Sequence, residues 1–130
     1  MIVDTDVVID IMQQNRDALR VVAALEEHGT PLSVSVVTLY ELFHSLERVR
    51  DSNHRRQQIE SVLHQLPARE ATAAVMKKAG RIDGALAADG RAIGMGDTII
   101  AATGLVHEEA VLTRNVDHFD RIDGLQIESY

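Results

Sequence analysis

The hydrophobic pattern of the chain alternates between short apolar runs and longer segments with apolar residues at helical spacing. Ile2-Val3 is an apolar run that breaks off at Asp4, which is typical of a short buried strand. The stretch from Leu39 to Val49 instead carries apolar residues at i, i+3, i+4, i+7 and i+10, which form one face of a helix. The pattern predicts strands at residues 2–4, 32–37, 110–113 and 125–127. It predicts helices at residues 6–14, 17–28, 35–49, 53–66, 69–88 and 98–106.

This order of elements indicates the fold class. Strands that alternate with helices favour a parallel sheet covered on both faces, so we expect an α/β fold, a three-layer α/β/α domain with a central parallel sheet. No linker, repeat or low-complexity segment divides the chain, and residues 1–130 are expected to form a single domain. The small residues at positions 101–104 should allow the last long helix to pack closely on the sheet.

Composition narrows the compartment and the partners. The chain has no cysteine, which excludes disulfides, zinc thiolates and a cysteine nucleophile and favours a reducing compartment, expected to be the cytoplasm. Its longest apolar stretch, residues 98–106, is far shorter than the ~20 residues that span a bilayer, so no membrane association is expected. The formal net charge of -7 disfavours non-specific coating of nucleic acid, because such binding depends on Lys and Arg.

Three predicted elements each deliver an acid near the carboxyl ends of the strands. Asp4 follows the first strand, Glu41 lies in the helix after the second, and Asp97 stands at the start of a late helix. Right-handed crossovers bring such positions to one edge of a parallel sheet. Two carboxylates ~4 Å apart repel by about 4 kcal/mol at an effective dielectric of 20, so a cation or shared protons must offset the repulsion. Oxygen ligands favour Mg²⁺ or Mn²⁺, which activate water for attack on phosphodiesters.

Each acid taken singly also has an ordinary structural explanation. Asp6 and Asp97 stand where helix N-caps stand, and Thr38-Leu-Tyr-Glu41 fits a capping box in which Glu41 only bonds the backbone N–H of Thr38. Asp4 is different, because it follows a strand that it does not cap. The recurrence of acids at one sheet edge therefore favours a metal-dependent site. The six histidines show no metal-ligand spacing and are expected at the surface or in packing.

The sequence resembles PIN-domain ribonucleases, and among them the VapC-type toxins of bacterial and archaeal toxin–antitoxin pairs. Four stretches carry the resemblance in the order and spacing of that family: IVDTDVVI at 2–9, SVSVVTLYEL at 33–42, GDTIIAAT at 96–103 and LTRNVDHF at 112–119. One of these motifs alone would be weak evidence. Together they cover essentially the whole chain, and they are specific.

The resemblance implies a PIN-like domain with a catalytic triad of Asp4, Glu41 and Asp97 that binds metal, Glu41 directly or through water. It implies that Mg²⁺ or Mn²⁺ supports endoribonuclease activity on a cellular RNA such as tRNA. It also implies a homodimer and a cognate antitoxin that inserts a segment into the cleft. The remaining site residues are a fourth polar group, Asn115 or Asp117, and three residues that shape the site, Thr5, Asp6 and Thr113.

The chain departs from the family pattern at three positions. Asp6 stands where the family usually has Asn, which adds an acid that affects metal affinity. Ser45 replaces a frequent Gly four residues after Glu41. The fourth acid of many members is Asn115 here, so either Asp117 substitutes for it or three carboxylates suffice.

A local cationic strip lies within this acidic chain. Asp51 is its one acid between positions 48 and 56, and the strip either guides RNA to the site or is a solvated helix end. An arginine in the fourth motif is a further candidate for contact with RNA. The candidate RNA-binding residues are Arg48, Arg50, Arg55, Arg56 and Arg114.

Two other functions remain to be distinguished. The segment from Asp4 to Val8 also fits the nucleophile loop of haloacid-dehalogenase-like phosphatases, in which Asp4 would attack phosphorus and Asp6 would act as acid and base. Residues 98–106 contain no second acid of the kind those enzymes use, which weighs against them. The second alternative is a non-catalytic PIN-like module that binds RNA or a partner without cutting.

Overall fold

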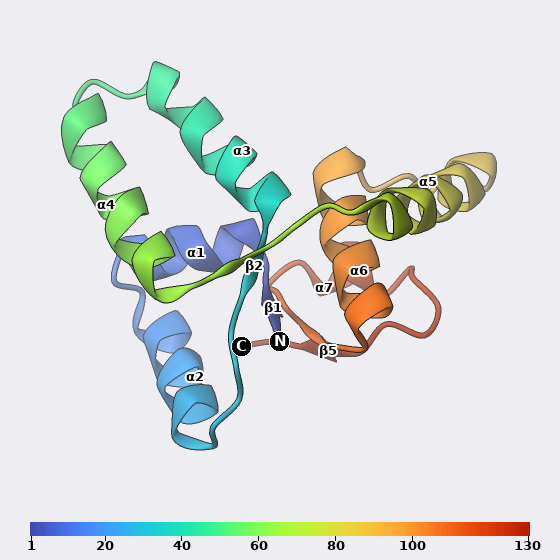
Figure 1. Cartoon of the computed structure of the whole chain (residues 1–130), viewed down its shortest axis with the longest axis horizontal. Coiled ribbons are helices and arrows are strands. Elements are labelled where there is room, and N and C mark those ends of the chain that lie inside the picture. The colour runs from blue at the N-terminus through green and yellow to red at the C-terminus, as the bar shows by residue number, and fades with distance from the viewer.

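The computed structural model describes residues 1–130 and is built around parallel strands (Figure 1). β1 (Ile2–Val3) pairs with β4 (Val111–Leu112), and β4 pairs with β5 (Ile127–Glu128). β2 (Val34–Ser35) pairs with β3 (Ala68–Arg69). A parallel bridge between Ile2 and Ser33 joins the two sets, so the strands run in the order β3-β2-β1-β4-β5.

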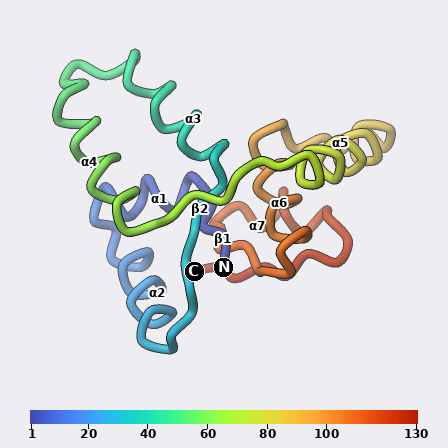
Figure 2. Tube along the Cα trace, viewed as in Figure 1, coloured from blue at the N-terminus to red at the C-terminus, as the bar shows by residue number.

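Seven α-helices and one 3₁₀ helix surround these strands. Figure 2 traces α3 and α4 as an arm that leaves the strands and returns to them, while α5 and α6 lie on the other side of the molecule. The helices are α1 (Thr5–Met12), α2 (Arg16–Glu27), α3 (Val36–His44), η1 (Ser45–Arg48), α4 (Ser52–Gln65), α5 (Ala73–Ala88), α6 (Met95–His107) and α7 (Val116–Phe119).

Alternate residues of the strands face two separate hydrophobic clusters. Val3 and Leu112 pack in the cluster that α1, α3 and α4 cover. Ile2 and Val111 pack in the cluster that α5, α6 and α7 cover. Because successive strand residues point to opposite faces, the sheet lies between two helical layers. The three-layer α/β/α fold with a central parallel sheet is therefore confirmed.

Several predicted element boundaries are wrong. The helix expected at 35–49 ends at His44 and continues as η1, where the Ser45 hydroxyl donates to the carbonyl of Leu42 and competes with regular helical bonding. The helix expected from residue 69 begins at Ala73, because Ala68 and Arg69 pair with β2 as a fifth strand. The short helix α7 was also not predicted.

The start and the packing of α6 determine the position of Asp97. Gly94, with φ of 97°, is the N-cap residue, so Asp97 lies inside the first turn and is not the cap predicted as an alternative. Further along α6, Ala101, Ala102 and Thr103 are fully buried. A Cβ on Gly104 would lie 2.9 Å from the carbonyl oxygen of Glu109, which confirms the expected close packing on the sheet. No helix combines the length and apolarity needed to cross a membrane.

Candidate active site

Asp4 lies at the carboxyl end of β1, where the chain passes directly into α1. Its side chain makes no capping bond, although Asp4 rather than the predicted Asp6 occupies the N-cap position of α1. Oδ2 of Asp4 instead accepts a hydrogen bond of 2.7 Å from the hydroxyl of Thr113, at the end of β4. Only 2% of Asp4 is exposed. Burial raises the pKa of Asp4 to about 7, against the lowering effect of the Thr113 bond, and the negative charges of Asp97 and Asp6 raise it further.

Glu41 is held by a relay of two hydroxyl groups. The Thr5 hydroxyl donates to Oε1 of Glu41 at 2.8 Å, and its oxygen lies 2.9 Å from the hydroxyl oxygen of the fully buried Thr38. Because Thr5 has only one hydroxyl proton, Thr38 must donate to Thr5. The capping box is therefore wrong, and Ser35 caps α3 instead. Burial raises the pKa of Glu41 despite the Thr5 bond, and the charges of Asp97 and Asp6 add to the rise.

Gly96 closes the other side of the Glu41 carboxylate. A Cβ at position 96 would lie 3.0 Å from Oε2 and 3.1 Å from Cδ of Glu41, closer than side chains normally approach. The first turn of α6 therefore packs directly against the Glu41 side chain. This contact brings Asp97, the next residue, to the same edge of the sheet as Glu41.

Asp97 contacts a histidine that the sequence did not reveal as a site residue. Nδ1 of His118, on α7, lies 2.8 Å from Oδ2 of Asp97 and 2.8 Å from the side-chain nitrogen of Asn115. Nδ1 of a neutral imidazole carries either a proton or a lone pair, so it can form only one of these two bonds. Donation from Nδ1–H to the Asp97 carboxylate is charge-assisted and is therefore stronger than a bond accepted from Asn115. Among the six histidines, which were expected at the surface or in packing, His118 also contacts a candidate site residue. Asn115, the N-cap residue of α7, and His118 are three residues apart, and this spacing is the one sequence signal that links these two residues.

The two candidates for the fourth polar group are separated by the structure. The side-chain nitrogen of Asn115 lies 2.8 Å from Nδ1 of His118, the same atom that contacts Asp97. The side chain of Asp117 is 83% exposed and forms an ion pair of 2.9 Å with Arg121 on the surface. Asp117 is therefore not brought together with the other acids. Asp6 lies in the first turn of α1 with an exposed side chain, close enough for its charge to act on Asp4 and Glu41.

The arginines predicted to bind RNA occupy two different places. Four of them lie at the end of the α3–α4 arm that is remote from the strands (Figure 1), and these are Arg48, Arg50, Arg55 and Arg56. Arg114 directly follows Thr113 and forms an ion pair of 2.8 Å with Asp10. Only Arg114 is therefore adjacent in sequence and in structure to the acidic edge.

The donor atoms of the site determine whether it can hold a divalent cation. Its side-chain donors are almost entirely oxygen atoms, the chemistry that Mg²⁺ and Mn²⁺ prefer, and the charges of Asp97 and Asp6 raise the pKa values of Asp4 and Glu41. No three carboxylate or imidazole groups are placed to hold one ion together in this structure. Mg²⁺ usually keeps several waters and takes only one or two carboxylates directly, so the donor set fits such an ion without a closed protein cage.

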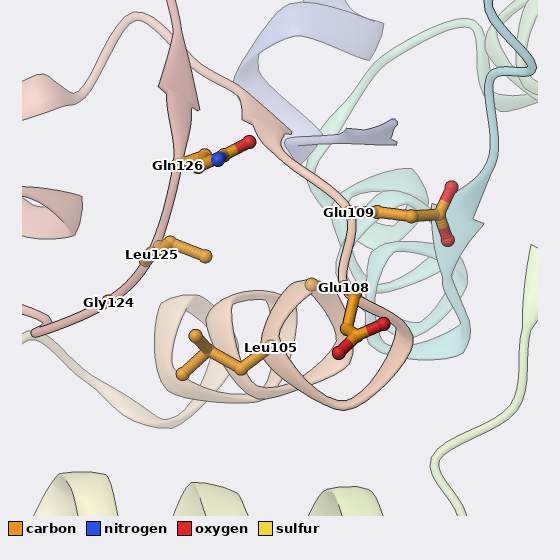
Figure 3. A pocket seen from close by; sticks show the side chains of 7 residues that line it. Leu105, Glu108, Glu109, Gly124, Leu125 and Gln126 are labelled. Atoms are coloured by element: carbon orange, nitrogen blue, oxygen red, sulfur yellow. The ribbon is translucent and has the colours of Figure 1, made fainter.

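A pocket in the surface lies at the amino ends of the strands, on the opposite edge of the sheet from the acids. It is lined by residues that precede β4 and β5, among them Glu108, Glu109 and Gln126 (Figure 3). Glu109 is committed to ion pairs of 2.7 Å with the amino group of Met1 and with Arg69. The amino ends of the strands therefore carry a structural ion-pair network, and the acids gather at the carboxyl ends.

Fold and site together define a parallel α/β domain with acids gathered at the carboxyl edge of its sheet. A family model described as PIN domain matches residues 1–125. The chain therefore belongs to the PIN domain family, which confirms the resemblance seen in the sequence. The match also removes the phosphatase alternative, because it assigns the Asp4 segment and the rest of the chain to one different family.

Individual relatives agree with this assignment. The chain is 28% identical over 99 residues to the tRNA(fMet)-specific endonuclease VapC of Shigella flexneri, across 76% of this chain and 75% of that protein. VapBC2 from Rickettsia felis, solved bound to a DNA fragment from its promoter, superposes with a TM-score of 0.90 at 18% identity, over 99% and 97% of the two chains. DNA-bound VapBC from Salmonella typhimurium gives a TM-score of 0.88 at 23% identity, over 98% and 96%. The two solved structures show the same fold.

Proposed function

We propose that this chain is a metal-dependent endoribonuclease that cleaves cellular RNA and acts as the toxin of a VapBC-type toxin–antitoxin pair. One observation carries the proposal. Asp97 on α6 lies close enough to Asp4 after β1 and to Glu41 on α3 for its charge to raise the pKa of both carboxyl groups, although the three elements are far apart in sequence. Such repulsion between carboxylates destabilises the fold, and a purely structural role for these acids would not offset that loss of stability.

In the proposed reaction the residues of the chain have separate roles. Asp4 and Asp97 would hold a divalent cation, with Glu41 contributing directly or through water. When bound, Mg²⁺ or Mn²⁺ would polarise a phosphate oxygen and lower the pKa of the attacking water. The hydroxyls of Thr113 and Thr5 fix the carboxylates of Asp4 and Glu41 by hydrogen bonds of 2.7 Å and 2.8 Å.

Around Asp97 a second pair of side chains sets the orientation. His118 bonds Oδ2 of Asp97 at 2.8 Å, and the Asn115 side chain lies beside the same imidazole nitrogen. Groups that orient a metal-binding carboxylate typically change affinity or activity by about 10–100-fold when they are removed. Asn115 therefore serves as the fourth polar group in this proposal, placed beside the imidazole that bonds Asp97.

Substrate and partners are proposed from the relatives. The Shigella flexneri protein is named as a tRNA-specific endonuclease, which supports a structured RNA such as tRNA as the substrate here. The neighbours from Rickettsia felis and Salmonella typhimurium are VapBC complexes, which supports a cognate antitoxin as the partner. A homodimer is part of the same proposal and is tested by light scattering of the purified chain.

The decisive experiment is cleavage of total bacterial RNA by the purified protein, with the fragment ends mapped. We expect cleavage with Mg²⁺ or Mn²⁺ and none with EDTA. Asp97→Asn should lower the rate by about a hundredfold or more, as for loss of one electrostatic group in an active site. Asp83→Asn removes an exposed acid of α5 and is the matched control, expected to cut like the unmodified protein.

The same experiment decides against the non-catalytic alternative. A module that only binds RNA would retain affinity for RNA yet yield no fragments with either metal. Equal cleavage by the unmodified protein and by Asp97→Asn would instead point to a contaminating nuclease and would refute the proposed site.

A further inference from the structure

A buried carboxylate beside the acidic edge holds an arginine and a tyrosine together. Asp10, on α1, is 5% exposed. Its Oδ2 forms an ion pair with Nε of Arg114 at 2.8 Å and accepts a hydrogen bond from the hydroxyl of Tyr130 at 2.6 Å. Burial and the Asp10 carboxylate raise the pKa of Tyr130 well above its usual range, so its hydroxyl remains a donor. We call Asp10, Arg114 and Tyr130 the arginine clasp.

The clasp uses only one side of the guanidinium group. The ion pair with Asp10 engages Nε, and the Arg114 side chain is still 49% exposed. The ion pair involves neither Nη1 nor Nη2. A guanidinium presents its donors in a rigid planar fork, so fixing Nε also fixes the direction in which these two groups point. The clasp therefore presents a pre-oriented pair of donors to solvent.

This fork lies at the rim of the candidate active site. Arg114 follows Thr113, whose hydroxyl bonds Asp4 at 2.7 Å. Asp10 is four residues after Asp6, so both lie on one face of α1. Tyr130 is also close enough to this edge for the charge of Asp4 to act on its hydroxyl. The acids at this edge repel an RNA backbone, and a cation at the rim offsets that repulsion for one phosphate.

We propose that Arg114 binds a backbone phosphate of the RNA strand next to the acidic site, with Asp10 as the positioning residue that anchors its Nε. Two parallel N–H···O bonds from Nη1 and Nη2 match the oxygens of a phosphate diester. This inference rests on the proposed function, because it assigns a contact to the same RNA. It goes beyond that function by assigning the clasp a role in binding rather than in fastening the C-terminus to α1.

The test measures binding separately from cleavage. All variants are made in the Asp97→Asn background, and the affinity for unfractionated bacterial tRNA is measured with Mg²⁺ at several salt concentrations. Arg114→Gln should weaken binding about tenfold at low salt and reduce the slope of log affinity against log salt by about 0.7–0.9, the share of one phosphate contact. Arg20→Gln removes an exposed arginine of α2 and should change neither quantity.

For Asp10→Asn, the expected change in RNA affinity is opposite in sign to the change that net charge alone predicts. The substitution removes a negative charge, so bulk electrostatics predicts tighter RNA binding. If Asp10 anchors Arg114, binding becomes weaker by about threefold to tenfold because the fork loses its fixed direction. Asp17→Asn, an exposed acid on α2, supplies the matched charge control and should bind RNA as tightly as the parent or slightly more tightly.

Tyr130→Phe separates the binding role from a purely structural one. It removes one hydrogen bond of the clasp but leaves Arg114 on Asp10, so it should lower Tm while RNA affinity is retained. The proposal is overturned if Arg114→Gln behaves like Tyr130→Phe, with a lower Tm and an unchanged salt slope, or if Arg114→Gln weakens only the complex with an antitoxin. Loss of cleavage by the unmodified protein would refute the proposed function but leave this binding result intact.

Discussion

Replacing Asp4 with asparagine should stabilise the metal-free protein at neutral and alkaline pH. The pKa of Asp4 rises from 3.8 to about 7 on folding, mainly through burial. Between these values the folded state holds a proton that the unfolded state has released. Stability therefore falls as the pH rises from about 4 to about 7, and the asparagine side chain, which stays neutral, escapes this loss.

The size of the effect follows from the shift. A rise from 3.8 to about 7, at 1.36 kcal/mol per pKa unit, corresponds to about 4 kcal/mol of stability lost above pH 7. Asparagine keeps an oxygen that can accept the Thr113 hydrogen bond, although a neutral acceptor is weaker than a carboxylate by about 1 kcal/mol. We therefore expect Asp4→Asn to gain about 2–4 kcal/mol at pH 8 in EDTA, and close to nothing at pH 4.

Urea unfolding followed by far-UV circular dichroism is the suitable assay, because the chain contains no Trp. With a urea m-value of about 1–3 kcal/mol/M, the predicted gain moves the midpoint by roughly 1–2 M. Added Mg²⁺ or Mn²⁺ should stabilise the unmodified protein by about 2.7 kcal/mol when the metal concentration is a hundred times the Kd for that metal. The same addition should leave the stability of Asp4→Asn nearly unchanged. Asp17→Asn provides the control for loss of an exposed charge.

The reasoning fails if Asp4→Asn is less stable than the unmodified protein in EDTA at pH 8. It also fails if the two proteins lose stability in parallel between pH 4 and pH 8, since the pH dependence would then arise from other groups. Stabilisation of Asp4→Asn by metal, equal to that of the unmodified protein, would remove Asp4 from the metal site.

Four further predictions concern neighbouring positions. Gly96→Ala places a Cβ 3.0 Å from the Glu41 carboxylate, so the cleavage rate should fall about tenfold or more while urea stability changes by less than about 1 kcal/mol. Gly104→Ala meets the Glu109 carbonyl oxygen at 2.9 Å and should instead cost about 1–3 kcal/mol of stability, with residual activity proportional to the folded fraction. Asn115→Ala should slow cleavage about tenfold and Asp117→Asn should not, and the reverse result would make Asp117 the fourth group. Arg48→Gln together with Arg50→Gln should lower the salt slope of RNA binding by about 1.4–1.8 only if the end of the α3–α4 arm touches RNA, and an unchanged slope would exclude that contact.

The sequence was sufficient for the fold class and for the edge at which the acids gather. Asp4 ends an apolar run that reads as a strand in any context, and the other acids follow from the alternation of strands and helices. Both inferences depend only on short-range pattern and on the handedness of parallel connections. Those are features that a single sequence carries.

The partners of the acids could not be predicted in the same way. Thr113 is 109 residues from Asp4, and His118 is 21 residues from Asp97, so each contact depends on how whole elements pack. The strand β3 could not be predicted for the same reason. Ala68 and Arg69 have no strong preference for a strand, and they become one because they lie beside β2. Pairing across the sheet overrides the helical pattern that begins nearby.

Thr38 and Glu41 show why the role of an acid can depend on a distant pairing. A capping box requires Thr38 to be the first, extended residue of the helix. Here β2 ends at Ser35, which caps α3, so Thr38 is already inside the helix and turns its hydroxyl toward Thr5. The end of β2 is in turn set by its register with Ala68 and Arg69. The carboxylate of Glu41 is therefore not used in a cap. It bonds Thr5 and lies against Gly96 because of a strand pairing that no local motif around Glu41 reveals.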